Sequence, residues 1–333
     1  MTQRLKWLDY AKGIGIFLVV LGHTLRGLVN SSILESSTAV LALDRWIYAF
    51  HMPLFFFLSG LFIERSASKP FKDFVIDKLK TIAYPYLLWS LLQSLLQIAV
   101  SRYTNSQLAW TNLWRIIYEP VMQFWFLYTL FVIMLVYAIA RKLRVSQVLF
   151  LSLCLLLYTL QGYVGLGPWG VLYLIQTYAL YLGLGALVAS KDSLAKLRQC
   201  KISTLQIVTI VGFLTIGLAV GLNMTEEKWL EPAIALCGIC ATLTLAMLLE
   251  QFNVTRFVEQ WGRLSLEIYV AHTIASSMLR IALQHVFGFT EPMTHLILGT
   301  GVGIYAPIAL ETICQRIKFR YMFTLRLPRP NRS

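Results

Sequence analysis

Long runs of apolar residues recur along this chain from one end to the other, and each is close to the length that crosses a lipid bilayer. A transmembrane helix needs about 20 mostly apolar residues, and the hydrocarbon core admits no irregular backbone with unpaired groups. The runs cover residues 11–29, 40–63, 80–100, 122–140, 145–161, 170–190, 203–222, 231–249, 264–286 and 294–314. The sequence therefore predicts an all-α fold, a polytopic integral membrane bundle of about ten transmembrane helices.

The lysine and arginine residues between these runs are distributed unequally between the two sides of the membrane. When the connecting segments are assigned alternately to the two sides, starting with the N-terminus inside, the inside set holds 23 of the 29 lysine and arginine residues. The inside segments are the N-terminus, 64–80, 141–146, 190–202, 250–263 and 315–333. The basic residues left over are Arg26, Arg45, Arg102, Arg115, Lys228 and Arg280. This bias marks the cytoplasmic side, so both termini are predicted to be cytoplasmic, which requires an even number of crossings.

The composition favours one membrane domain. Hydrophobic residues make up 57% of the 333-residue chain and charged residues 14%, whereas a soluble domain is about a quarter charged. The net charge of +13 comes from basic residues beside apolar runs, where they meet anionic lipid headgroups, so we expect no nucleic-acid partner. We predict a transmembrane domain over residues 1–315 and a basic cytoplasmic tail over residues 316–333.

The first run carries ionisable residues on one helix face. Lys12 and His23 are eleven residues apart, which is three turns plus about 20°, with a rise of about 16 Å. Asp9 lies one turn before Lys12 and shares that face. Ionisable groups inside a membrane are expensive and mark function by default. The structural alternatives are a lysine that snorkels to the interface and a histidine held in packing by a hydrogen bond.

The second run contains His51 and Pro53. Pro53 removes a backbone donor and is expected to kink the helix. His51 then has two interpretations, because it either satisfies a carbonyl freed by the kink or faces the same cavity as His23. The sequence leaves both open.

The ninth run has a polar face. Ser265, Tyr269, His272 and Ser276 follow one another at helical spacing and lie on one side of a helix. Such a stripe faces protein or water rather than lipid, and it serves either as hydrogen-bonding contact between helices or as part of a site. Arg280 near the outer end either snorkels or binds an anionic acceptor.

Two other groups of residues have ordinary and functional interpretations. Lys78 and Lys80 precede the third run, where lysines belong to the positive-inside pattern but also attract phosphate. Trp125 opens the fourth run from outside, which is normal behaviour for an interfacial tryptophan. No spacing of cysteine or histidine indicates a metal site.

Several of these features occur together in the membrane-bound acyltransferase type 3 family, which the chain resembles. The shared markers are the basic residue and histidine at Lys12 and His23, FHMPLFFFLSG at residues 50–60, the helix start at Pro85-Tyr86, Trp125-Phe126-Leu127, and SLEIYVAH at residues 265–272. These markers follow one another from the first apolar run to the ninth, so the resemblance covers nearly the whole chain. The block around His51 is most similar to the fucose 4-O-acetylase-like branch.

The resemblance implies an enzyme of the bacterial cytoplasmic (inner) membrane. Such proteins take an acyl group, usually acetyl, from cytoplasmic acyl-CoA and pass it to a hydroxyl, usually on a surface polysaccharide or its lipid-linked precursor. Acetyl-CoA is then a co-substrate, and no bound cofactor or metal is implied. The family's functional basic residue and histidine fall on Lys12 and His23. Members often carry arginines where this chain has Lys78 and Lys80, so donor contacts there are less specific.

A mechanism follows as a hypothesis. His23 deprotonates the acceptor hydroxyl, and Asp9 positions Lys12. Lys12, Lys78 and Lys80 hold the phosphates of CoA. The expected acceptor-side residues are His51, Trp125, Tyr269, His272 and Arg280. An acyl-histidine intermediate is equally compatible with the sequence.

Two rival functions remain at this stage. A multi-span transporter or flippase for an envelope glycan precursor fits the spans, although the ionisable residues show no matching second set of the kind that inverted repeats produce. The second rival function is that of a non-catalytic partner in a polysaccharide assembly complex. The acceptor, the acyl chain and the oligomeric state are left open.

Overall fold

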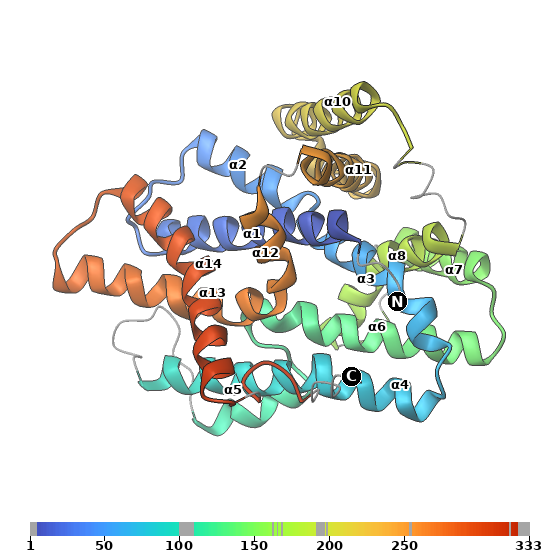
Figure 1. Ribbon diagram of the computed structural model, residues 1–333, viewed down its shortest axis with the longest axis horizontal. Helices are drawn as coiled ribbons and strands as arrows, with labels where there is room; N and C mark the ends of the chain where they lie inside the picture. The colour runs from blue at the N-terminus through green and yellow to red at the C-terminus, as the bar shows by residue number, and fades with distance from the viewer. Residues whose placement is uncertain are drawn as a thin grey trace. The chain divides into compact units, whose positions relative to one another are not determined.

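A computed structural model of the chain shows helices joined by short connections and no strand in the part that it describes (Figure 1). The described residues are 5–99, 110–161, 163, 164, 166, 167, 169–190, 197, 199–252, 255–319 and 321–325. Most of the predicted inside loop 190–202 and the last eight residues of the predicted tail, 326–333, lie outside these ranges.

The helices follow the predicted runs closely. The α-helices are α1 (Lys6–Asn30), α2 (Thr38–Tyr48), α3 (His51–Ala67), α4 (Phe71–Lys78), α5 (Tyr84–Ala99), α6 (Trp125–Lys142), α7 (Gln147–Thr159), α8 (Gly170–Ser190), α10 (Ile202–Gly221), α11 (Glu231–Phe252), α12 (Arg256–Arg263), α13 (Ser265–Ile281) and α14 (Pro292–Arg316). Two π-helical turns, η1 (Leu79–Ala83) and η6 (Ala282–Val286), continue α4 and α13. Three 3₁₀ turns lie in connections, at Trp110–Ile117, Met122–Phe124 and Met224–Glu226.

Nine helical segments of the described residues are long and apolar enough to cross a membrane. The prediction of a polytopic all-α membrane bundle is therefore confirmed. The predicted run 145–161 is the exception, because it forms the 13-residue helix α7. Its N-terminus is fixed by Ser146, whose hydroxyl accepts a hydrogen bond from the Leu149 amide at 3.1 Å. At about 1.5 Å per residue α7 is shorter than the roughly 30 Å hydrocarbon core.

The predicted run 40–63 is broken in two. We expected Pro53 to kink one continuous helix, but the break comes earlier, between the end of α2 at Tyr48 and the start of α3 at His51. Pro53 then lies in the first turn of α3, where a helix needs no backbone donor. The break matters because it turns the side chains of Tyr48 and His51 toward each other, with ring centroids 4.6 Å apart.

The chain divides into two compact units. The first comprises residues 1–61 and 181–307, and the second comprises residues 62–180 and 308–333. In the first unit α1 is central and packs against α2, α11, α12 and α13. Its buried core includes Leu18, Ile47, Phe50, Ile216 and Ile234.

Glycines allow the closest helix contacts of the first unit. A Cβ on Gly13 would collide with the Val258 carbonyl, and one on Gly262 would collide with the Asp9 carbonyl. The backbones of α1 and α12 therefore touch, as small residues permit in membrane proteins. This contact fixes α12 against the N-terminal part of α1.

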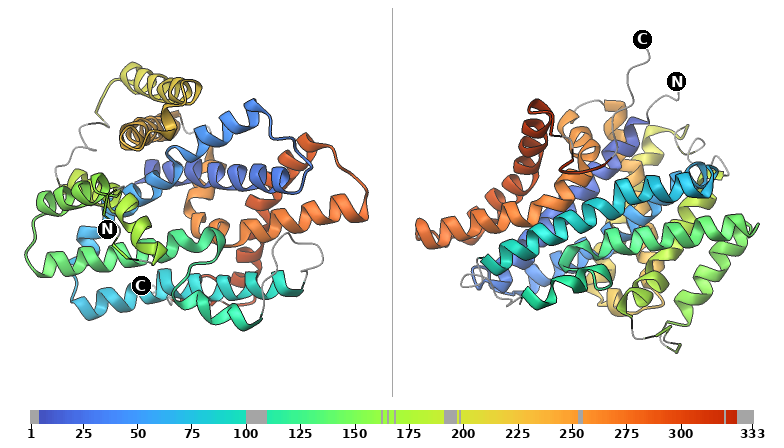
Figure 2. Two further views of the ribbon diagram at one scale, coloured as in Figure 1. Left: turned by 180° about the vertical axis from the view of Figure 1, so that it is seen from behind. Right: turned by 90° about the horizontal axis from the view of Figure 1, so that it is seen from below.

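In the second unit, the run from α4 through α5 lies along α6 (Figure 2). The start of the predicted basic tail is part of this unit. Tyr84 donates a hydrogen bond to the Tyr321 carbonyl at 2.7 Å, and the Trp89 indole donates to the Met322 carbonyl at 3.0 Å. Phe323 stacks on Trp89 with ring centroids 5.4 Å apart. Residues 321–325 thus bind to α5.

Candidate active site

His23 and four other ring side chains, from the helices α1, α2, α3 and α13, lie close together in the first unit. The His23 and His272 ring centroids are 5.2 Å apart, which joins α1 to α13. Tyr48, at the break between α2 and α3, lies 6.3 Å from His23 by the same measure. Tyr48 also contacts His51, and Tyr269 lies 6.2 Å from His272. We call these five residues the histidine cluster.

Two members of the histidine cluster have a defined tautomer. The Nδ1 of His51 lies 2.7 Å from the Ile47 carbonyl oxygen, and the Nδ1 of His272 lies 2.7 Å from the Tyr269 carbonyl oxygen. A carbonyl only accepts, so Nδ1 carries the proton in both rings and Nε2 keeps its lone pair. Both Nε2 atoms are buried and have no hydrogen-bond partner among the described residues. Each is therefore an unsatisfied acceptor within the histidine cluster.

His23 differs from its two neighbours because it is only partly buried. Within the described part of the chain it contacts the rings of Tyr48 and His272 and forms no hydrogen bond. Its nitrogens are thus available to a substrate, and histidine is the side chain that most often transfers protons in enzymes. The adjacent His272, with an acceptor at Nε2, can stabilise a proton on the neighbouring ring.

Tyr48 is held by a pair of charges that the sequence analysis did not assign to the site. Arg26 binds Asp44 through two hydrogen bonds, at 2.6 and 2.8 Å. Its guanidinium carbon lies 3.2 Å above the centre of the Tyr48 ring, a cation–π arrangement. The spacing of Arg26, one turn after His23, was the available signal, since side chains three residues apart share a helix face.

The sequence-predicted residues separate into groups. His23, His51, Tyr269 and His272 come together in the cluster. Lys12 and Asp9 lie nearer the start of α1, and the rise along the helix from Lys12 to His23 is about 16 Å. Arg280 lies two turns beyond His272, where it donates a hydrogen bond to Gln284 at 3.5 Å. The remaining predicted residues, Lys78, Lys80 and Trp125, belong to the second unit.

The two lysines of that unit lie on either side of a helix junction. The Lys78 ammonium is 5.5 Å from the centre of the Phe74 ring. Lys80 accepts two hydrogen bonds at its carbonyl, from the Leu325 amide at 3.1 Å and from the Thr324 hydroxyl at 3.2 Å. The tail is therefore attached next to these lysines.

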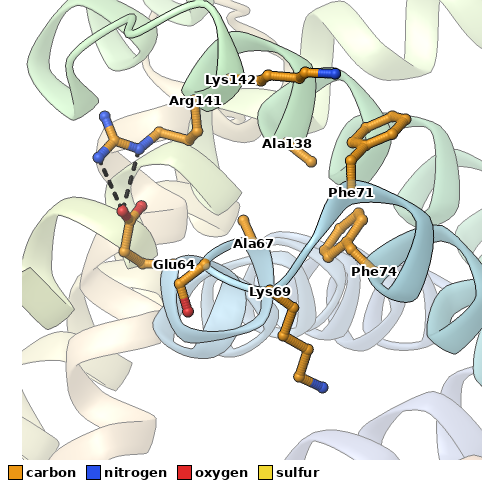
Figure 3. Close-up of a pocket in the computed structure, with 9 residues that line it drawn as sticks. Glu64, Ala67, Lys69, Phe71, Phe74, Ala138, Arg141 and Lys142 are labelled. Atoms are coloured by element: carbon orange, nitrogen blue, oxygen red, sulfur yellow. Dashed lines mark hydrogen bonds and ion pairs between the residues drawn. The ribbon is translucent and has the colours of Figure 1, made fainter.

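A basic pocket occurs in this unit, with a cavity of about 400 Å³ (Figure 3). Glu64 on one wall pairs with Arg141 at 2.9 Å and accepts a hydrogen bond from Tyr137. Lys69 and Lys142 line the pocket without an ion pair among the described residues. Two of its cations thus have no carboxylate partner.

Trp125 lines the largest of three described cavities, of about 770 Å³. The walls are mostly aromatic and apolar, with one acidic residue, and consist of Tyr118, Glu119, Pro120, Met122, Trp125, Trp169, Gly170, Val171, Tyr173 and Leu174. The Trp125 ring packs against Tyr178 at 5.0 Å between centroids. Its side chain therefore forms part of a binding-sized concave surface.

The histidines do not form a metal site. Among the described residues, no three side chains of histidine, cysteine, aspartate or glutamate gather in a way that could hold an ion. The chemistry open to the cluster's own residues is proton transfer or nucleophilic attack by a histidine.

Fold and cluster together define a multi-pass helical membrane protein with a histidine centre built on its first helix. The model of the acyltransferase 3 family, described as an acyltransferase domain, matches residues 5–312. The chain belongs to this family, which supports membrane acyltransferase activity and favours an enzyme over the transporter or flippase. No curated protein and no solved structure matches the chain.

Proposed function

We propose that this protein is an O-acyltransferase of the bacterial inner membrane. It moves an acetyl or other acyl group from cytoplasmic acyl-CoA to a hydroxyl of a cell-surface or lipid-linked carbohydrate. The observation that carries the proposal is the ring of His23, partly exposed and without a hydrogen bond within the described residues, beside the buried His272. We keep the fucose 4-O-acetylase-like branch as part of this proposal.

The reaction begins with proton removal. His23 takes the proton from the acceptor hydroxyl as the oxygen attacks the thioester carbonyl carbon. A C–O bond forms, the C–S bond breaks, and the proton then passes from His23 to the departing CoA sulfur. His272, with its Nε2 lone pair, stabilises the imidazolium during this interval. In the alternative, His23 attacks the thioester itself and the acceptor takes the acyl group from it.

The donor would approach from the cytoplasmic end of α1. Lys12, positioned by Asp9, would attract its phosphates there, and Lys78 and Lys80 are the other proposed phosphate contacts. The distance of about 16 Å from Lys12 to His23 along the helix suits a long extended thioester arm.

The carbohydrate acceptor is supported by the cavity around Trp125. A sugar offers apolar C–H faces that pack against aromatic rings, and hydroxyls that need acceptors such as a carboxylate. The cavity supplies both, with Trp125, Trp169 and Tyr173 in its wall and Glu119 beside them. Within the histidine cluster, Tyr269 and His51 would contact the acceptor, and Arg280 would favour an anionic one.

The donor half of the proposal is tested with purified protein in nanodiscs and acetyl-CoA labelled in the acetyl group. We expect slow release of CoA, which accelerates when envelope glycolipids are added, together with labelled glycolipid. If the protein neither binds CoA nor turns it over under both conditions, the proposal is contradicted. The alternative function of a transporter or flippase is then favoured.

The acceptor half predicts a specific defect for Trp125→Ala. Loss of one aromatic wall should raise the KM for the glycolipid by about tenfold, because a buried aromatic contact contributes on the order of 1–2 kcal/mol. The KM for acetyl-CoA should stay the same. Trp229→Ala, at an exposed indole outside this cavity, is the matched control. An unchanged glycolipid KM would exclude this cavity as the acceptor site.

A further inference from the structure

The short helix α12 presents two arginines on one face. Arg256 and Arg263 are its first and last residues, and seven residues make nearly two full turns, with a rise of about 10 Å. They line a pocket of about 410 Å³ together with Glu259, Gln260 and Leu264. α12 joins two membrane-spanning segments, α11 and α13, within the predicted inside segment 250–263.

The opposite face of α12 is fixed to α1. Val258 and Gly262 are buried, and both are in backbone contact with the part of α1 that contains Asp9 and Gly13. Trp261 stacks on Phe17 at 6.0 Å between ring centroids. The arginine pair is therefore held on a rigid backbone alongside the segment of α1 that contains Lys12.

Within the described residues, neither arginine has a carboxylate at ion-pair distance. Both are exposed, and neither forms a hydrogen bond or ion pair with its side chain among the described residues, Glu259 included. Four other arginines form ion pairs, Arg26–Asp44, Arg45–Glu226, Arg115–Glu119 and Arg141–Glu64, whereas Arg65, Arg144 and Arg316 resemble Arg256 and Arg263 in forming none among the described residues. A guanidinium binds phosphate through two parallel hydrogen bonds, so each arginine offers an unused bidentate donor.

We propose that Arg256 and Arg263 bind phosphate groups of the acyl donor, as a second part of the donor site beside Lys12. This inference rests on the proposed function, which requires a donor with several phosphates at the cytoplasmic surface. Two forks about 10 Å apart along the helix can engage separate phosphates of one ligand, which a lysine cannot do with the same geometry. An anionic lipid headgroup offers the same chemistry and is the alternative that the experiment separates.

The test compares acetyl-CoA with 3′-dephospho-acetyl-CoA in the wild-type protein and in Arg256→Gln/Arg263→Gln. For the double variant we expect a KM for acetyl-CoA at least about tenfold higher, since hydrogen bonds to charged groups are the stronger ones, and a kcat within about twofold. The wild type should prefer acetyl-CoA over its dephospho form, and the double variant should lose that preference. Arg256→Lys/Arg263→Lys keeps the charge without the fork and should give an intermediate KM.

The matched control is Lys69→Gln/Lys142→Gln, which removes the same charge from the other basic pocket (Figure 3). Its KM for acetyl-CoA should stay within about twofold of wild type. Thermal unfolding of all variants is compared, and exposed side chains should change it little. If the glutamine variant unfolds, the KM of the lysine variant for acetyl-CoA and for 3′-dephospho-acetyl-CoA shows whether the two arginines bind donor phosphates.

The outcomes are distinguishable. If the arginine variants keep the wild-type KM and donor preference while turnover loses its dependence on anionic lipid in the nanodisc, the arginines bind headgroups and the inference is wrong. If the wild type binds labelled CoA without turnover, weaker binding by the double variant still supports the inference. If the wild type neither binds CoA nor turns over, the proposed function fails as well.

Discussion

Replacement of His23 by alanine is expected to abolish acyl transfer while leaving the fold intact. A positioned general base contributes about 10²–10⁴-fold to a proton transfer, and the scheme has no other base at the acceptor hydroxyl. The structural cost is small, because His23 is partly exposed and forms no hydrogen bond within the described residues. Transfer of labelled acetyl to glycolipid in nanodiscs measures the activity, and thermal unfolding measures the fold.

The control for this variant is His285→Ala, at an exposed histidine in η6 outside the histidine cluster. It should keep wild-type activity and thermal stability. A His23→Ala protein that is folded and fully active would remove the basis of the mechanism. If the His23→Ala protein is inactive because it unfolds, His23→Gln is the variant that tests the mechanism. Glutamine fills more of the space than alanine but cannot act as a base at neutral pH.

The same pair of proteins separates the two roles open to His23. If it acts as a nucleophile, labelled acetyl-CoA without acceptor leaves label on the wild-type protein and none on His23→Ala. If it acts as a base, neither protein is labelled, and CoA release by the wild type stays slow until an acceptor is added. Substitution of His272 should weaken either reaction without abolishing it, since His272 acts through the neighbouring ring.

The helical geometry of single segments was accessible from the sequence, and contacts between segments were not. The positions of Lys12 and His23 on one face of α1 follow from their spacing and the pitch of a helix. That His23 and His272 lie side by side does not, because the two residues are far apart in the chain and nothing in either segment encodes which helices pack together. In the sequence, His23 and His272 were associated only because both belong to motifs shared with the acyltransferase type 3 family.

The break before His51 shows a different limit. A proline in an apolar run predicts a kink, but the run alone does not say whether the proline falls inside a helix or in its first turn. Here α3 begins at His51, and the His51 ring binds the Ile47 carbonyl at the break. The same ring also contacts Tyr48 in the histidine cluster.

Residues outside the family markers were missed for an electrostatic reason. Arg26 was counted only as a basic residue on the outer side, and Arg256 and Arg263 only as members of an inside loop. A charge count cannot tell a cation paired with a carboxylate, such as Arg26 with Asp44, from one without a partner. That distinction requires the positions of the acidic side chains, which the sequence does not give.

Gly60→Ala is expected to destabilise the protein far more than its single added methyl group suggests. A Cβ at Gly60 would collide with the Leu182 carbonyl and lie 3.0 Å from the Cα of Gly185, and a Cβ at Gly185 would collide with the Phe57 carbonyl. These atoms belong to the backbones of α3 and α8, so no side chain can rotate away and the helices must separate. Overpacking of this kind costs about 1–3 kcal/mol, measured as a shift in the unfolding of purified protein by titration with SDS.

Gly217→Ala in α10 is the matched control, because nothing lies within 4 Å of its added Cβ. Alanine favours a helix over glycine by up to about 1 kcal/mol, so this variant should be as stable as wild type or slightly more stable. Equal loss of stability in both variants would show that the α3–α8 contact is not close. The double variant Gly60→Ala/Gly185→Ala should lose less stability than the two single losses added together, because one separation of the helices relieves both collisions.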